Sequence, residues 1–461
     1  SMSTRLFGVV WYLPLLLLAV VEVAALVSAY LIAVTILQSM VSSPAFSWQG
    51  ALLFALITLV AFAGLGLFSR RQRANRKGIM LRVAVGIMVG AMVSWVLARW
   101  LGWPGPSVPQ LVIAATIAVF LTVLLRLLAE KLVSEDVFRR RVIVFGGGQR
   151  AASIAGLRRR VDQRGFKLLG FLPSEGEAAV VDAARMLPGN RPLLDLAREL
   201  QADEIVVAMD DRRRSFPIAD LLECRFDGIE VTELVTFLER ETGKVHLDVL
   251  NPSWLIFGAG FRRDHLRLAS ERALDLFACV ALLLLVWPLM LLTAIAIMLE
   301  DGPRAPIFYR QTRVGFRGKN FQVIKFRSMR VDAEKAGAQW AQANDTRVTR
   351  VGAIIRKLRI DELPQLINVL RGDMSFVGPR PERPEFVANL SAQIPYYQER
   401  HFVKPGITGW AQVCYPYGAS ETDAAEKLQY DLYYVKNHSL LFDIMILLQT
   451  AEVVLLGKGA R

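Results

Sequence analysis

The pattern of apolar and polar positions divides the chain into an apolar first third, a polar middle and a mixed last part. Four apolar runs lie in the first third, at about residues 7–37, 50–68, 79–100 and 110–128. Each is close to, or above, the roughly 20 residues that a helix needs to cross the hydrocarbon core of a bilayer. The pattern therefore predicts an α-helical membrane domain of four transmembrane helices, at residues 1–132.

Basic residues in the connections predict the orientation of these helices. The second connection carries five Lys and Arg residues and the segment after the fourth run carries four, whereas the first and third connections are nearly free of them. By the positive-inside rule, both ends of the chain are expected in the cytoplasm. Ser1 precedes Met2, and we expect it to be a cloning remnant; the first run is too long for a cleaved signal peptide. Glu22, inside that run, either has a function or faces neighbouring helices or an interface.

Short β-like runs alternate with helical ones between residues 133 and 255. This alternation is typical of a parallel sheet covered by helices, so we predict a small α/β Rossmann-like domain. Gly146, Gly148 and Ala151 follow the first run and fit G-x-G-x-x-A, the turn that holds a phosphate in nucleotide-binding domains. No clear acidic residue closes the second run, and the same turn also serves tight packing without a ligand. We favour a structural or regulatory role over nucleotide binding.

A fifth apolar run, at residues 274–299, is also long enough to span a membrane. Basic residues flank both of its ends, so the flanks give no direction for crossing. Pro288 lies near its middle, where it removes one helix hydrogen bond and predicts a kink. The pattern fits a re-entrant helix, which enters the cytoplasmic leaflet and returns, as well as it fits an ordinary kinked span.

Charged residues with possible chemistry gather in the last part of the chain. Lys325 and Arg327 lie on one side of a strand-like run, and two cations at that spacing can grip a diphosphate. A helix-like run then places Arg356 five residues before Asp361, which is followed directly by Glu362. Cations around this acidic pair favour its ionised form, which a nucleophile and a metal ligand both require. Hard oxygen ligands without a Cys or His cluster point to Mg²⁺ shared with substrate phosphates.

Composition limits the partners. The net charge of +13 indicates anionic partners such as phospholipid head groups and sugar nucleotides. Nucleic acid has the same sign, but the chain lacks the interleaved aromatic residues and the basic face that such binding uses, so we expect none. The three cysteines have no zinc or disulfide spacing, which fits a reducing compartment.

A series of motifs follows in a fixed order: the Pro-broken apolar helix, KFRSM (325–329), DELPQLINVLRGDMSFVGPRPE (361–382), PGITGWAQV (405–413) and YDLYYVKNHSLLFDI (430–444). With this series the chain from about residue 272 to 457 resembles the catalytic domain of bacterial polyprenyl-phosphate sugar-1-phosphate transferases, the monotopic phosphoglycosyl transferases. The whole chain resembles the large form of that family. NPSWLIFGAGF and CYPYGAS look most like the undecaprenyl-phosphate glucose phosphotransferases of exopolysaccharide loci.

The resemblance implies an α+β monotopic catalytic domain at residues 265–461, whose re-entrant helix, at about residues 273–299, breaks at Pro288. Asp361 would attack the sugar-bearing phosphate of a UDP-sugar, release UMP and hold the sugar phosphate covalently until undecaprenyl phosphate takes it. Glu362 would help to position Mg²⁺ or the reacting groups. The implied metal ligands are Asp361, Glu362 and Asp431. The implied substrate contacts are Arg356 for the lipid or transferred phosphate, Lys325 and Arg327 for the diphosphate, and Arg380, Pro381 and Glu382 for the uridine part.

Three positions depart from the family pattern. Trp287 precedes Pro288 where serine is usual, Arg359 stands where the family has a small or polar residue, and Cys414 stands where asparagine is frequent. Glucose is the sugar that the resemblance favours, ahead of galactose and the N-acetylated hexosamines. The expected setting is the bacterial inner membrane, with the catalytic domain on the cytoplasmic leaflet and a homodimer as the assembly. A membrane-tethered regulator or scaffold of polysaccharide synthesis is the less favoured alternative.

Overall fold

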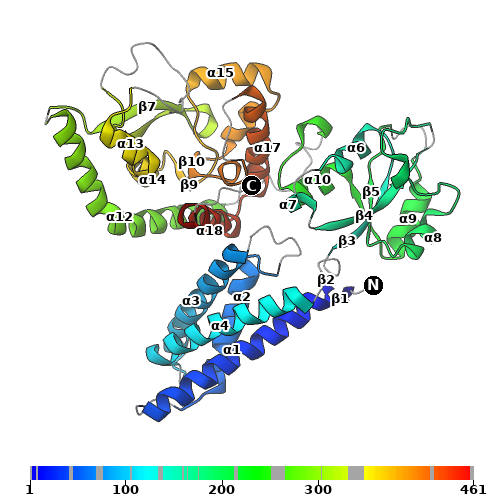
Figure 1. The fold of residues 1–461 in the computed structure, drawn as a ribbon, viewed down its shortest axis with the longest axis horizontal. Coiled ribbons are helices and arrows are strands. Elements are labelled where there is room, and N and C mark those ends of the chain that lie inside the picture. Colours follow the sequence, from blue (N-terminus) through cyan, green and yellow to red (C-terminus); the bar gives the residue numbers. More distant parts are fainter. Residues whose placement is uncertain are drawn as a thin grey trace. The chain divides into compact units, whose positions relative to one another are not determined.

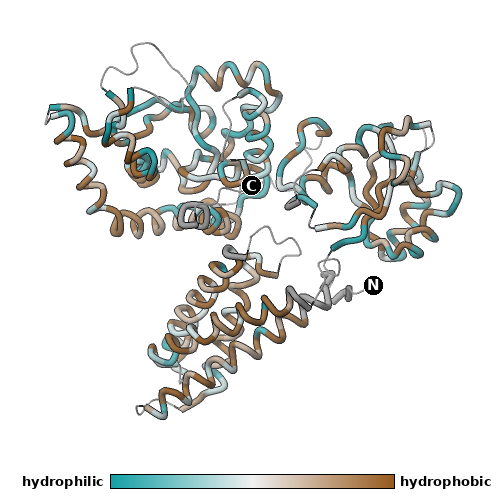
Figure 2. The backbone as a smooth tube through the Cα atoms, viewed as in Figure 1, coloured by the Kyte–Doolittle hydropathy of each residue, from teal (hydrophilic) through white to brown (hydrophobic). Residues whose placement is uncertain are grey.

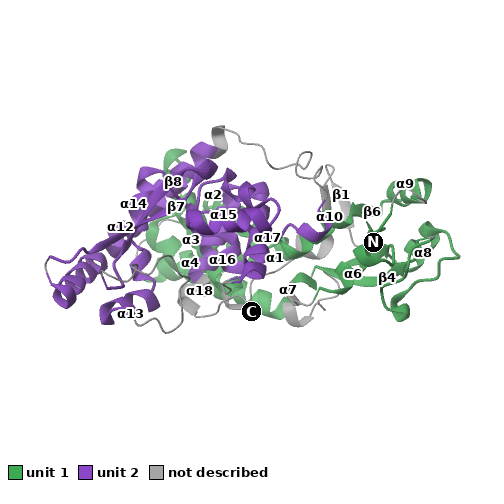
Figure 3. Ribbon diagram, turned by 90° about the horizontal axis from the view of Figure 1, so that it is seen from above, with its two compact units in different colours: residues 1–243 green, residues 244–461 purple. Residues whose placement is uncertain are grey.

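The computed structural model divides into two compact units, residues 1–243 and 244–461, which Figure 3 shows in different colours. The described residues are 3–6, 9–40, 45–68, 76–103, 106–132, 139–157, 160–163, 165–174, 176–211, 216–250, 265–302, 304–330, 347–415 and 420–456. Most of the basic second connection, NPSWLIFGAGF and part of CYPYGAS lie outside them.

The first unit contains the four predicted apolar helices, which Figure 1 shows in blue and cyan. Three of them are long enough to cross a membrane, whereas the second has 17 residues and is shorter. The first helix begins later than predicted, because a short antiparallel hairpin precedes it, formed by β1 (Ser3–Leu6) and β2 (Val9–Tyr12). The helices are α1 (Leu13–Met40), α2 (Trp48–Gly64), α3 (Arg76–Trp100) and α4 (Val108–Leu132).

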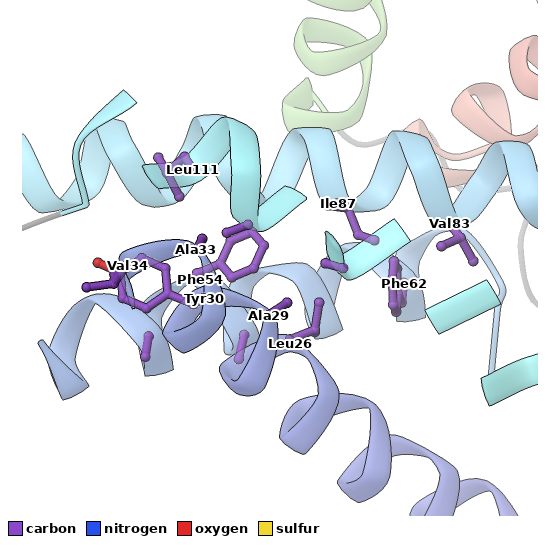
Figure 4. Packing of buried hydrophobic residues seen from close by; sticks show 14 of the residues in the cluster. Leu26, Ala29, Tyr30, Ala33, Val34, Phe54, Phe62, Val83, Ile87 and Leu111 are labelled. Atoms are coloured by element: carbon purple, nitrogen blue, oxygen red, sulfur yellow. The ribbon is translucent and has the colours of Figure 1, made fainter. Parts of the chain in front are cut away.

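Apolar side chains from all four helices form the core of this bundle, where Tyr30, Phe54 and Phe62 are fully buried (Figure 4). Glu22 is also fully buried, and its carboxylate lies 2.6 Å from the guanidinium of Arg126 on α4. The same guanidinium lies over the ring of Phe62 at 5.8 Å. A charge in a membrane helix needs such a partner, so Glu22 faces its neighbours and ties α1 to α4.

The middle of the chain forms a four-stranded parallel sheet with the order β4-β3-β5-β6. Its buried β-branched residues, such as Ile143 and Ile205, pack with apolar residues of the flanking helices. The strands are β3 (Arg140–Phe145), β4 (Phe166–Leu172), β5 (Glu204–Val207) and β6 (Glu230–Glu233). The helices are α6 (Gln149–Ala155), α7 (Arg160–Gln163), η1 (Ala183–Arg185), α8 (Leu193–Glu199), α9 (Ile218–Phe226) and α10 (Leu234–Thr242).

The glycine-rich turn between β3 and α6 is bound by two carboxylates of the chain itself. The amide of Gly147 donates to Glu177 at 2.9 Å, and the first two amides of α6 donate to Asp210, both at 2.8 Å. The amide of Asp210 donates to the other oxygen of Glu177 at 2.6 Å. A Cβ atom on Gly148 would overlap the Asp210 carboxylate. These carboxylates lie where a phosphate lies in nucleotide-binding domains of this kind.

The second unit begins with residues 244–250, which pack into its core through Val245 although the predicted boundaries give them to the middle domain. Its two small sheets pair β7 with β8 antiparallel and β9 with β10 parallel. The strands are β7 (Phe308–Val314), β8 (Asn320–Phe326), β9 (Ser375–Val377) and β10 (Gly406–Thr408). The longer helices are α12 (His265–Asp301), α13 (Arg350–Lys357), α14 (Gln365–Arg371), α15 (Pro384–Gln393), α17 (Glu421–Asn437) and α18 (Leu440–Leu456). Shorter turns are η2 (Leu247–Val249), η3 (Phe316–Gly318), η4 (Ile360–Glu362), η5 (Tyr397–Phe402) and α16 (Trp410–Cys414).

The fifth apolar run lies in α12, a helix of 37 residues that continues through Pro288. The expected break is therefore a bend within one helix, because a single proline removes one hydrogen bond without ending the ladder on both sides. Figure 1 shows the helix bent part-way along, and Figure 2 shows apolar residues along most of its length. Large apolar side chains such as Phe277 and Leu284 are exposed on it.

Polar residues near both ends of α12 bind it to the rest of the second unit. Arg272 donates to two carbonyl oxygens at the end of α14, at 2.6 and 2.7 Å. Asp275 accepts from an amide of β9 at 2.8 Å. At the other end, Glu300 accepts from the first two amides of α13, at 2.8 and 3.0 Å, and Asp301 pairs with the guanidinium that follows β8.

Candidate active site

Asp361 and Glu362 lie on η4, the single tight turn that joins α13 to α14. Arg359 starts this turn with a left-handed backbone, at a φ of 59°. A residue with a side chain is uncommon in that conformation, which explains why glycine or asparagine would suit the position. Pro364 follows the pair and opens α14, where its missing amide hydrogen costs nothing. The turn therefore holds both acids at the junction of two helices.

Glu362 is held by cations from three parts of the unit. Its carboxylate lies 3.1 Å from Lys325 on β8, 2.8 Å from Arg380 and 3.7 Å from Arg359. Its side chain is 13% exposed. Burial alone raises the pKa of Glu362, but the charges of Arg380 and Lys325 outweigh it and hold that pKa well below its ordinary value. The anionic form of Glu362 is thus favoured, and it keeps Lys325 and Arg380 at the site.

Asp361 is the uncommitted member of the pair. Its half-buried side chain makes no hydrogen bond or ion pair with any residue in the described part of the chain. Burial and the charge of Glu362 raise the pKa of Asp361, and the charges of Lys325 and Arg356 oppose that rise. Two neighbouring carboxylates whose environments push their pKa values apart are typical of sites in which the two have different roles.

Of the three cations predicted to contact the phosphates, two belong to this site and one does not. Lys325 bonds Glu362, and Arg356 on α13 is close enough for its charge to lower the pKa of Asp361. Arg327 instead donates to Asp301 at 2.8 Å and to the carbonyl of Pro306 at 2.6 Å, and it is buried. Its predicted role in gripping a diphosphate is not supported, because its guanidinium is used to fix the end of α12.

The segment Arg380–Pro381–Glu382 joins the acidic pair to the β7–β8 hairpin. Arg380 bonds Glu362, and Arg313 of β7 donates to the carbonyl of Pro381 at 3.1 Å and to the Glu382 carboxylate at 3.5 Å. Arg313 is absent from the residues predicted above. The signal that could have found it is the run of consecutive polar residues in FYRQTRV, directly before the strand that carries Lys325.

Asp431, predicted as a metal ligand, is bound to a buried arginine instead. Its carboxylate lies 2.8 Å from Arg400 of η5, and the two side chains are 3% and 7% exposed. Within the ranges that the structure describes, no group of three or more His, Cys, Asp or Glu residues could hold a metal ion. Asp361, Glu362 and Asp431 therefore do not form the expected cluster. The uncommitted oxygens of Asp361 still fit Mg²⁺ that is bound mainly through substrate phosphates, since Mg²⁺ commonly takes one or two carboxylates.

Comparison with known proteins places this site in a family. The profile of the bacterial sugar transferase family matches residues 266–457. The UDP-glucose:undecaprenyl-phosphate glucose-1-phosphate transferase of Xanthomonas campestris pv. campestris is 32% identical over 450 residues, which cover 93% of this chain and 87% of that protein. The chain belongs to the bacterial sugar transferase family. Membership confirms the predicted resemblance and the predicted class of enzyme, a phosphoglycosyl transferase.

Two further relatives differ in the sugar that their names give. The UDP-N-acetylgalactosamine-undecaprenyl-phosphate N-acetylgalactosaminephosphotransferase of Aeromonas hydrophila is 44% identical over 241 residues, 52% of this chain and 56% of that protein. The undecaprenyl-phosphate glucose phosphotransferase of Komagataeibacter xylinus is 33% identical over 329 residues, 70% of this chain and 60% of that protein. The chain thus spans little more than half the length of these two members of the family.

Proposed function

We propose that the protein transfers a sugar 1-phosphate from a UDP-sugar to undecaprenyl phosphate and releases UMP, as the first membrane step in the synthesis of a bacterial surface polysaccharide. The observation that carries this proposal is the unequal acidic pair, in which Glu362 is fixed among cations and Asp361 makes no hydrogen bond or ion pair with the residues that the structure describes. A reactive carboxylate among cations suits an attack on a phosphate, and relatives named for this reaction align with the chain.

The reaction proceeds in two displacements at Asp361. First, a carboxylate oxygen of Asp361 bonds to the sugar-bearing phosphorus, the phosphoanhydride bond breaks and UMP leaves with the electron pair. Second, a phosphate oxygen of undecaprenyl phosphate attacks the same phosphorus and frees the Asp361 carboxylate. Lys325, Arg380 and Arg356 stabilise the phosphate charges in both steps. Mg²⁺ bound by the pair and the phosphates would supply further charge neutralisation.

Glucose is the proposed sugar, with galactose and an N-acetylhexosamine as alternatives. The purified protein, given undecaprenyl phosphate, Mg²⁺ and one UDP-sugar at a time, is expected to release UMP fastest from UDP-glucose, by about tenfold or more over the other sugars. The rate of UMP formation measures this. Faster release from UDP-N-acetylgalactosamine would change the sugar alone, whereas no UMP from any UDP-sugar would reject the function.

The proposal includes a re-entrant α12 and a catalytic unit on the cytoplasmic face of the inner membrane. A straight helix of 37 residues would be about 55 Å long and would put its ends on opposite sides of a bilayer. Residues near both ends of α12, among them Arg272 and Glu300, instead bind other parts of the second unit, the end of α14 and the start of α13. These contacts, together with the bend and the basic flanks, support a helix that returns to the side it entered.

Cysteine labelling tests that topology. In a Cys414→Ser background, Arg304→Cys directly after α12 is expected to react with a membrane-impermeant maleimide only after the cells are opened. Ala45→Cys, in the connection between α1 and α2, is the matched control and is expected to react in intact cells. Labelling of Arg304→Cys in intact cells would mean that α12 crosses the membrane.

The middle domain is assigned to the Rossmann-like class on its parallel sheet and its strand–glycine turn–helix order, with boundaries near residues 133 and 243, since residues 244–250 pack into the second unit. Its role is structural or regulatory rather than nucleotide binding, since Glu177 and Asp210 occupy the amides of the turn. A homodimer remains the proposed assembly on the resemblance to the large form of the family.

A further inference from the structure

The β7–β8 hairpin carries a series of polar side chains on the face that bears Lys325. The antiparallel register places Tyr309 directly opposite Lys325. Alternate residues of a strand share one face with their cross-strand partners, so Gln311 and Arg313 lie on this face as well. We call Tyr309, Gln311 and Arg313 the polar row; all three are half-buried.

Hydrogen bonds link the polar row in sequence. The amide nitrogen of Gln311 donates to the hydroxyl of Tyr309 at 3.2 Å. Arg313 donates to the amide oxygen of Gln311 at 2.6 Å and, with its other terminal nitrogen, to the carbonyl of Pro381 at 3.1 Å. Arg313 therefore fixes which side of the Gln311 amide accepts and which side donates.

The polar row runs along the hairpin from the position opposite Lys325 to the segment that carries Arg380. Tyr309 lies opposite Lys325, which bonds Glu362, whereas Arg313 reaches the Glu382 carboxylate. Because each residue of a strand advances about 3.4 Å, Gln311 lies about 7 Å, and Arg313 about 14 Å, beyond Tyr309. An attack by Asp361 on the sugar-bearing phosphate leaves the second phosphate, the ribose and the base to extend away from the acidic pair over this range.

We propose that the polar row reads the base of the nucleotide, with Gln311 as the specificity-determining residue and Arg313 as the residue that positions it. This inference rests on the proposed function. Uracil presents an N–H donor beside a carbonyl acceptor, and an amide oriented as in Gln311 can accept from the first and donate to the second. Cytosine reverses this pair at the same edge. A flipped amide would fit cytosine but would turn its NH₂ group against the donor of Arg313, so the row selects uracil over cytosine.

Binding of UMP and CMP to the full-length protein, measured by calorimetry in detergent, tests the inference independently of turnover. The wild type is expected to bind UMP at least about tenfold more tightly than CMP. Gln311→Glu, which keeps the bond from Arg313 but loses the amide donor, is expected to bring the ratio close to one, as is Arg313→Met. In UMP release, Gln311→Glu is expected to raise the KM for the UDP-sugar about tenfold, with kcat and the KM for undecaprenyl phosphate within about twofold.

Arg310→Ala provides the matched control, because Arg310 is an exposed residue of the same strand on the opposite face. It is expected to keep the wild-type ratio, and an unchanged melting temperature in each variant establishes that the fold is intact. Equal binding of UMP and CMP by the wild type, or a full ratio in folded Gln311→Glu, overturns the inference whether or not the protein turns over. Failure of the proposed function would be recognised by a different result, the absence of UMP release from every UDP-sugar.

Discussion

Asp361→Asn is expected to abolish UMP release, with a loss of at least about a thousandfold, because the amide has the shape of the carboxylate but cannot form an acyl phosphate. Turnover in the presence of Mg²⁺, undecaprenyl phosphate and the preferred UDP-sugar measures the loss. Incubation with a UDP-sugar labelled in the sugar, without the lipid, is expected to leave label on the wild-type protein and none on the variant.

Asp373→Asn is the matched control, since Asp373 is an exposed aspartate close to the same site in the sequence. It is expected to keep wild-type turnover. The wild-type rate is also expected to fall on the acid side at a pH above the ordinary aspartate range, because the pKa of Asp361 is raised and only its ionised form attacks. Full turnover by Asp361→Asn would show that another group is the nucleophile.

Asp431→Asn is expected to lower the free energy of unfolding by about 3–5 kcal/mol, because it leaves the buried charge of Arg400 without its partner. Thermal or denaturant unfolding in detergent measures the change. The concentration of Mg²⁺ that gives half-maximal UMP release is expected to stay the same, since Asp431 is bound to Arg400 rather than to the acidic pair.

The double variant Asp431→Asn/Arg400→Met separates the two roles of Asp431. It is expected to recover part of the lost stability, because it no longer buries an unpaired charge. A single variant that keeps normal stability but needs about tenfold more Mg²⁺ would restore Asp431 as the metal ligand that the resemblance implied.

Those parts of the fold that depend on local pattern could be predicted from the sequence. The four apolar helices follow from the length of hydrocarbon that a helix must cross, and the parallel sheet follows from alternating strand and helix patterns. The start of α1 was missed, because residues 9–12, VVWY, are apolar and β-forming at once. Periodicity alone could not separate the hairpin from the helix that continues it.

Within the site, the structure brings together the predicted residues that one motif holds, and it separates those whose positions depend on tertiary contacts. Lys325 and Arg327 share a face only while the strand continues, and β8 ends at Phe326. Arg327 therefore leaves the sheet and meets Asp301. The partner of Asp431 is 31 residues away in the sequence, and no local pattern relates the two. The difference between Asp361 and Glu362 likewise depends on cations from distant elements.

The carboxylates at the glycine-rich turn also explain why glycines occur in such a turn. A side chain on Gly148 would displace the Asp210 carboxylate, which lies against the backbone where a phosphate would lie. A turn of this kind can therefore favour glycine without a bound nucleotide, provided that the chain supplies an anion at the same place. In this chain the G-x-G-x-x-A turn marks a place where negative charge lies against the backbone, and that charge belongs to the protein.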